Sequence, residues 1–265
     1  MTMTHHPVKT LFGSANRPMS AIRFLPALLA LALAQSAEAG CQDAPQPHVD
    51  WTGCFRNLLM LGGDDLTEGV FSRATLTSTD FRRSKLARAK LTEAELSFTR
   101  FEEADLSGAD LSKAVGWKAN FTRANLDYAN LSGADLSRAI FVNAKIAGAN
   151  FRKSEMNRAD FSRADLTGAD LSKAEVARAV FTDAKLSGVR FTYADLARAN
   201  LKELDLAGTD FAGAYLFQAR LEGADLSRAV GLTQDQLALA CGTHETKLPA
   251  RVVQPDTWPC PPESD

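Results

Sequence analysis

The chain has 265 residues, of which 45% are hydrophobic and 23% charged, and its formal net charge at pH 7 is -2. These fractions are typical of an ordinary folded chain, so they exclude collagen-like, disordered and multi-span membrane proteins. A near-neutral chain has no long-range attraction for nucleic acid, so specific nucleic-acid binding is not expected.

Residues 1–39 predict a cleaved secretory signal peptide. Basic residues precede an apolar run at 24–34, and Ala37-Glu38-Ala39 places small residues before a cut at Gly40. The run is shorter than the roughly 20 apolar residues that span a bilayer, so no transmembrane segment is expected after cleavage. Met19 is an alternative start that gives a more compact signal. The predicted location is the periplasm or the extracellular space.

Residues 40–60 separate the signal from a long repeat. They contain Cys41, Cys54 and the phrase Val49-Asp50-Trp51-Thr52-Gly53-Cys54. Because a stack of repeats needs closed ends to avoid edge-to-edge pairing, we expect this segment to form an N-terminal cap.

Residues 61–230 repeat with a period of five. Of the 34 fifth positions from Leu61 to Leu226, 20 hold Leu and ten hold Phe, and Gly116 breaks the apolar series. Two positions before the apolar residue the chain mostly has a small one: of the 32 such positions from Ala74 to Ala229, 25 hold Ala. This period matches neither a helix nor a strand, so it predicts a solenoid whose units bury their apolar sides by stacking.

The repeated unit resembles the A(D/N)LXX pattern of pentapeptide-repeat proteins, of the exported bacterial type with cysteine-containing caps. Ala104-Asp105-Leu106-Ser107-Gly108 and Ala164-Asp165-Leu166-Thr167-Gly168 carry the resemblance. It implies an all-β fold, a right-handed quadrilateral β-helix with four pentapeptides per coil and about eight coils. The Leu or Phe and the preceding small residue would point inward.

The order of the aromatic residues supports a coil of four pentapeptides. One column of positions that stand 20 apart holds only Phe from Phe81 to Phe181, whereas the column from Leu66 to Leu226 holds no aromatic residue. Coils spaced by about 4.8 Å would give a rod about 40 Å long. At Gly116 we expect a bulge covered by Trp117, with a hinge or a partner contact as the alternatives.

Residues 231–265 are predicted to close the C-terminal end. Thr233 can cap a short helix at 234–240, with Gln236 at the capping-box position, and a Pro-rich tail follows.

The four cysteines lie in two groups at opposite ends of the expected rod. The rod is far longer than the ~4.4–6.8 Å between the Cα atoms of a disulfide, which leaves Cys41–Cys54 and Cys241–Cys260. Free thiols are the alternative. A lipidated Cys41 is disfavoured by Glu38, which stands where a lipoprotein signal needs a large aliphatic residue.

No catalytic motif is present. After signal cleavage only His48 and His244 remain as histidines, and the chain has no phosphate-binding loop or zinc-protease motif. We therefore expect no enzyme activity, no catalytic residue, no metal site and no cofactor.

Two charged columns at the 20-residue spacing are the candidate contact surface, together with Trp117. The acidic column stands three residues before the basic one, so an exposed salt-bridge stripe is favoured over an anion-binding ridge. The acidic column comprises Glu95, Asp135, Glu155, Glu175 and Asp195. The basic column comprises Lys118, Arg138, Arg158, Arg178 and Arg198.

The expected function is that of a rigid scaffold or protein-interaction module. Its partner would be an unknown protein or envelope component, and the chain would be a monomer or an end-to-end dimer. The resemblance also implies an alternative, protection of type II topoisomerases by an acidic rod that mimics DNA. Residues 61–230 hold 24 acidic and 24 basic residues. This balance and the predicted export disfavour the alternative.

Overall fold

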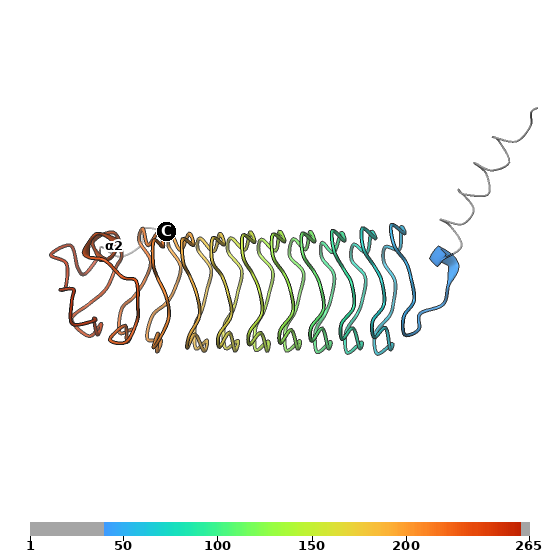
Figure 1. The fold of residues 1–265 in the computed structure, drawn as a ribbon, viewed down its shortest axis with the longest axis horizontal. Coiled ribbons are helices and arrows are strands. Elements are labelled where there is room, and N and C mark those ends of the chain that lie inside the picture. The colour runs from blue at the N-terminus through green and yellow to red at the C-terminus, as the bar shows by residue number, and fades with distance from the viewer. Residues whose placement is uncertain (1–39, 261–265) are drawn as a thin grey trace, which may run out of the picture. The chain divides into compact units, whose positions relative to one another are not determined.

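The computed structural model describes residues 40–260, and the predicted signal peptide at 1–39 lies outside the described residues. Within 40–260 there are two helices, the 3-10 helix η1 (Gly40–Gln42) and the α-helix α2 (Gln234–Leu239). The rest of this region is a stack of coils joined by isolated parallel bridges (Figure 1). Neither helix is long and apolar enough to cross a membrane.

Each coil is made of four pentapeptides, as the aromatic order predicts. Bridges join positions that stand 20 apart, for example Val115 to Asp135 and Asn120 to Ile140. The bonds run both ways between coils, because Phe121 N donates to Ile140 O at 2.7 Å and Ile140 N donates to Ala119 O at 3.0 Å. Every coil is thereby hydrogen-bonded to the coils on either side of it.

One turn per pentapeptide explains the period of five. The carbonyl of each core residue accepts a bond from the N–H three residues on, as Ala124 N donates to Phe121 O at 2.9 Å. The residue two after the core position has a positive φ, 58° at Arg123, which is the geometry of a type II turn. This residue therefore points outward at a corner of the coil.

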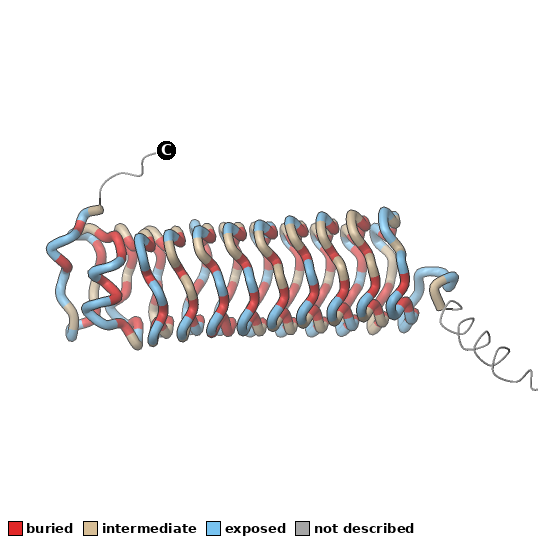
Figure 2. Tube along the Cα trace, turned by 90° about the horizontal axis from the view of Figure 1, so that it is seen from above, coloured by how far each residue is buried: buried red, intermediate tan, exposed pale blue. Residues whose placement is uncertain are grey.

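The core is built of stacked columns. The rings from Phe81 to Phe181 lie within 5° of parallel, with centroids 4.8–5.2 Å apart, and all are fully buried. This separation follows the spacing of paired strands and suits aromatic stacking. Buried and exposed residues alternate along each coil in Figure 2. This is the pattern expected when the inward side chains fill the space enclosed by the coil.

The bridge ladder begins at Asp50, earlier than the apolar repeat at 61–230. Trp51 is fully buried and packs edge-on against Phe71, with centroids 5.6 Å apart. Arg56 stands at the next core position and interrupts the apolar pattern. Its guanidinium lies 4.3 Å from the Trp51 ring centroid and donates to Cys41 O. The first coil is therefore formed although its sequence does not show the five-residue period of apolar residues.

Gly116 does not form the expected bulge. The ladder passes through it without an extra residue, because Val115 bridges to both Glu95 and Asp135. A Cβ placed on Gly116 would lie 2.8 Å from Leu136 Cδ2, so the leucine of the next coil fills the space beside the glycine. The backbone keeps its regular path at Gly116 because the side chain of Leu136 fills the space that a larger core residue would occupy.

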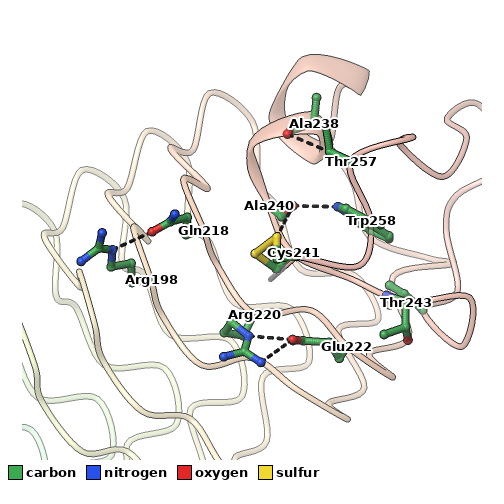
Figure 3. The surroundings of a disulfide bond; sticks show 12 residues. Arg198, Gln218, Arg220, Glu222, Ala238, Ala240, Cys241, Thr243, Thr257 and Trp258 are labelled. Atoms are coloured by element: carbon green, nitrogen blue, oxygen red, sulfur yellow. Dashed lines mark hydrogen bonds and ion pairs between the residues drawn. A yellow bond between two sulfur atoms is a disulfide. The ribbon is translucent and has the colours of Figure 1, made fainter. Parts of the chain in front are cut away.

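The C-terminal end is closed by α2 and the tail. Thr233 and Gln236 form the predicted capping box, and Gln236 Nε2 also donates to Phe211 O and Ala214 O, both at 2.8 Å. Trp258 is buried, and its indole N–H donates to Ala240 O at 2.7 Å (Figure 3). Gln236 thus bonds α2 to the last coils, and Trp258 bonds the tail to the end of α2.

Both ends carry a disulfide with the predicted pairing. Cys41 and Cys54 have Cα atoms 5.6 Å apart, and Cys241 and Cys260 have Cα atoms 5.2 Å apart. Each bond closes a short loop against the terminal coil, which restricts the unfolded chain and so favours the folded end.

Candidate functional site

On three of the four corners, some residues of opposite charge stand 20 positions apart and form ion pairs between coils. Arg88 Nη2 lies 2.6 Å from Glu68 Oε1, Arg123 Nη2 lies 2.6 Å from Glu103 Oε1, and Lys113 Nζ lies 3.8 Å from Glu93 Oε1. These pairs are exposed, so each contributes about 0–1 kcal/mol. Their main effect is that the two charges of each pair neutralise one another.

Ion pairs also lie on the flat sides between corners. Asp170 has two arginine partners there, with Arg190 Nη2 2.6 Å and Arg152 Nη1 3.2 Å from its Oδ2. Burial would raise the pKa of Asp170, but hydrogen bonds from Ser172 and from the two arginines outweigh burial and lower the pKa to about 2. This carboxylate stays ionised and bound by its neighbours.

The fourth corner carries five basic residues on successive coils with no acidic corner residue among them. All five are exposed and have φ values of 56–61°. Arg198 Nε donates to Gln218 Oε1 at 2.8 Å, and Lys118 Nζ lies 4.4 Å from the Trp117 ring centroid. Within residues 40–260, the other three make no side-chain hydrogen bond or ion pair. This basic column comprises Lys118, Arg138, Arg158, Arg178 and Arg198.

The acidic column beside it does not neutralise it. Within the described chain, no ion pair joins the two columns, so the expected salt-bridge stripe is wrong. Asp135 Oδ1 instead accepts from Ser137 N at 3.0 Å, and Asp195 Oδ1 from Ala197 N at 2.9 Å. The acids occupy bridge positions and the bases occupy turn corners. These two aspartates therefore bond to the turn between the columns and not to the bases beyond it.

Between the two columns runs a strip of mostly small residues. Its members stand one position after the core: Ser137, Asn157, Ala177 and Ala197. We call the two columns and this strip the segregated face, because its negative and positive charges are sorted into separate lines along the stack.

Exposed aromatic clusters mark both ends of the segregated face. Trp117 packs edge-on against Phe98 with centroids 4.9 Å apart. At the other end Tyr215 and Phe217 stack 6.1 Å apart and remain 48% and 37% exposed. Sequence reasoning identified Trp117 but missed the other three. Their spacing could have identified them. Phe98 stands 20 residues before Lys118. Tyr215 stands 20 residues after Asp195 of the acidic column, and Phe217 stands 20 residues after Ala197 of the strip.

The described residues offer little other chemistry. Between residues 40 and 260, no group of three or more His, Cys, Asp and Glu side chains is placed to hold a metal ion. His48 Nδ1 lies 3.4 Å from Glu68 Oε2 on the exposed surface of the first coil. The segregated face is therefore the strongest candidate for a functional surface.

Sequence models of pentapeptide-repeat families match most of the stack. The model described as "Pentapeptide repeat region" matches residues 134–211. The model described as "Pentapeptide repeats (8 copies)" matches four segments, 70–108, 84–115, 104–143 and 194–230. A search of curated proteins found no match.

Several solved structures are similar. HetL, a pentapeptide-repeat protein involved in heterocyst differentiation regulation from the cyanobacterium Nostoc sp. strain PCC 7120, is 28% identical. The likeness covers 76% of this chain and 91% of HetL, with a TM-score of 0.35. Full-length QnrB1, a plasmid-mediated fluoroquinolone resistance protein, is 16% identical, with 76% and 93% covered and a TM-score of 0.31. Rfr23 from the cyanobacterium Cyanothece 51142 is 22% identical, with 51% and 85% covered and a TM-score of 0.22.

Proposed function

The chain belongs to the pentapeptide-repeat family, and from this premise we propose that it is a non-enzymatic, exported interaction module. Its coils would follow the right-handed quadrilateral path that the family resemblance implies, in a rigid stack of about eight coils. The segregated face would bind a macromolecular partner.

The basic column carries this proposal, because Arg138, Arg158 and Arg178 have no side-chain partner within residues 40–260. The backbones of neighbouring coils are about 4.8 Å apart, so the column places like charges on adjacent strands, where they repel one another. Other corners show that the turn accepts an acidic residue at this position, as at Glu68 and Glu103. Folding therefore does not require the column, whereas a partner with anionic groups would use it.

Export is supported by the two disulfides. Disulfides form and persist in oxidising compartments, and both bonds here close the ends of the stack. Cell fractionation with thiol alkylation tests this part. We expect the protein in the periplasmic or secreted fraction with all four cysteines blocked by disulfides. Recovery from the cytosol with reactive thiols would contradict export.

Two variants with the same change in charge test the role of the face. The column variant reverses three free arginines of the basic column: Arg138→Glu, Arg158→Glu and Arg178→Glu. The control variant reverses three exposed arginines without ion pairs on other corners: Arg73→Glu, Arg83→Glu and Arg163→Glu.

Affinity capture from an envelope extract compares these variants with the wild type. We expect a bound component that the control variant retains and the column variant loses. Equal capture by both variants would show that the segregated face does not bind the partner.

A polyanion is the second candidate partner, because the three free arginines provide five N–H donors each with no acceptor in the chain. Retention on heparin tests this candidate. The wild type and the control variant should elute at higher salt than the column variant. Unchanged retention of the column variant would reject polyanion binding.

Protection of a type II topoisomerase by DNA mimicry is the weakest alternative. A DNA mimic needs a strongly negative surface, whereas residues 61–230 carry 24 acidic and 24 basic residues. Supercoiling assays with a quinolone should show no protection by this protein. Protection at stoichiometric concentration would restore this alternative.

A further inference from the structure

We infer that the segregated face joins two copies of this chain side by side, with their stacks parallel. The inference rests on the proposed function, since it names the partner of the same face. It differs from the end-to-end dimer considered for the sequence because the contact runs along the coils and leaves both ends free.

The sorting of charge favours a second copy over a polyanion. A polyanion that approaches the basic column also approaches the acidic column, which lies three residues away on the same coils and repels it. A second copy brings one line of each sign. Its basic column can face the acidic column of the first copy while its acidic column faces the basic one, so a face of this kind is complementary to itself.

Symmetry then decides the direction of the two stacks. A two-fold axis parallel to the stack keeps the order of the coils and exchanges the two edges of the face, so opposite charges meet. A two-fold axis across the stack reverses the coils and leaves the edges in place, so acid meets acid and base meets base. An isologous contact through this face is therefore parallel.

The regular spacing lets all rungs match together. Both copies repeat the same bridge pattern on every coil of the stack. When one arginine lies opposite an acid of the second copy, its neighbours do as well. Four pairs form on each edge: Arg138 with Asp135, Arg158 with Glu155, Arg178 with Glu175 and Arg198 with Asp195 of the second copy. The strip of mostly small residues between the columns allows the two faces to approach.

The aromatic clusters set the register. The cluster of Trp117 and Phe98 begins the face, and the cluster of Tyr215 and Phe217 ends it. In the parallel arrangement each cluster lies at the same level as its counterpart. A slip of one coil keeps four ion pairs on each edge, because Lys118 then lies opposite Asp135 on one edge and opposite Glu95 on the other. The same slip separates each aromatic cluster from its counterpart, so the clusters and not the charges select the register.

Solution mass with complementary variants tests the inference. The acid variant reverses three members of the acidic column: Asp135→Lys, Glu155→Lys and Glu175→Lys. Light scattering should give twice the protomer mass for the wild type and the control variant at low salt, and the protomer mass at high salt. The column variant and the acid variant should each be monomeric alone, while an equimolar mixture should recover the doubled mass.

Several outcomes would overturn the inference. Protomer mass for the wild type at low salt over a hundredfold range of concentration would do so, as would failure of the two folded variants to associate when mixed. Circular dichroism establishes that each variant is folded. If the wild type is monomeric but envelope capture still requires the basic column, the dimer is wrong and the proposed function stands.

Cross-linking checks the direction of the stacks. Carbodiimide joins lysine to carboxylates, so Arg158→Lys should give a covalent dimer whose linked peptide contains Glu155 or an adjacent member of the acidic column. The control Arg163→Lys lies on another corner and should give none. A dimer linked through acids of another face would reject the parallel arrangement.

Discussion

The stack contains two columns in which similar residues follow one another on successive coils, and their energetic effects are opposite. From Phe81 to Phe181 the rings are buried and stack 4.8–5.2 Å apart, so each ring stabilises the next. From Lys118 to Arg198 the side chains are exposed cations, so each repels the next. The same 20-residue rule thus stabilises the fold inside and opposes it outside. Only the first column is explained by folding.

The paired corners make the contrast sharper. Arg88 and Arg123 stand in the same turn position as Arg138, yet each has a glutamate on the preceding coil. The φ values of all three are 56–61°, so the backbone does not account for the difference. Arg138 has Lys118 and Arg158 as its corner neighbours and therefore no acidic residue on the same corner to pair with.

Removing one ring from the aromatic column should have the largest effect. Phe121→Ala leaves a cavity between two stacked rings and should lower the free energy of unfolding by about 3–5 kcal/mol. Urea unfolding followed by circular dichroism measures the change. The control Phe98→Ala affects a ring that is 47% exposed and should cost less than half as much. Equal costs would contradict the importance of the inner stack.

The gap at Gly116 should increase the cost of losing its neighbour. Leu136→Ala should cost roughly 2–5 kcal/mol and more than the matched Leu126→Ala, because Leu136 also fills the space beside the glycine. The same unfolding measurement compares the two. A smaller loss for Leu136→Ala would mean that this rung can collapse.

Asp170 should show what a paired charge contributes. Its pKa of about 2 in the folded protein lies below the usual value near 3.8, so the ionised carboxylate stabilises the fold above about pH 4. The contribution is about 2 kcal/mol and is lost as the pH falls from 4 to 2. Unfolding of Asp170→Asn at pH 7 and pH 2 measures this. We expect a deficit at pH 7 that vanishes at pH 2, and little deficit for Asp135→Asn at either pH.

The smallest effects should differ in sign between the two kinds of corner. Arg123→Ala removes an ion pair and should cost less than about 1 kcal/mol, whereas Arg138→Ala relieves repulsion and should be neutral or slightly stabilising. Added salt should reduce both differences. A cost for Arg138→Ala equal to that of Arg123→Ala would show that the basic column has a partner within the folded chain.

Much of the fold could be predicted because one rule governs most positions. The Phe order from Phe81 to Phe181 indicates the 20-residue coil, and the separation of the cysteine groups indicates both disulfides. Prediction from the repeat failed at two positions, where the side chain present is not the one that the repeat leads us to expect or where a neighbouring side chain fills its space. Arg56 hides the first coil behind a cation that covers Trp51, and Leu136 makes a bulge at Gly116 unnecessary.

The candidate surface was only half predictable. Spacing brought the basic and acidic columns together on one face, but it did not show whether they pair. That depends on where each side chain points, and the carboxylate of Asp135 bonds to its own turn at Ser137 N. The flanking aromatics were missed because Tyr215 and Phe217 are single residues that follow different columns.

The 20-residue coil also makes length a quantised property of this protein. Removal of one complete coil, such as residues 141–160, leaves every column aligned and shortens both the Phe column and the basic column by one member. Removal of a single pentapeptide would turn all later columns by one side and destroy both. The length of the stack can therefore change only in steps of one coil, each of about 4.8 Å, which is the distance between adjacent strands.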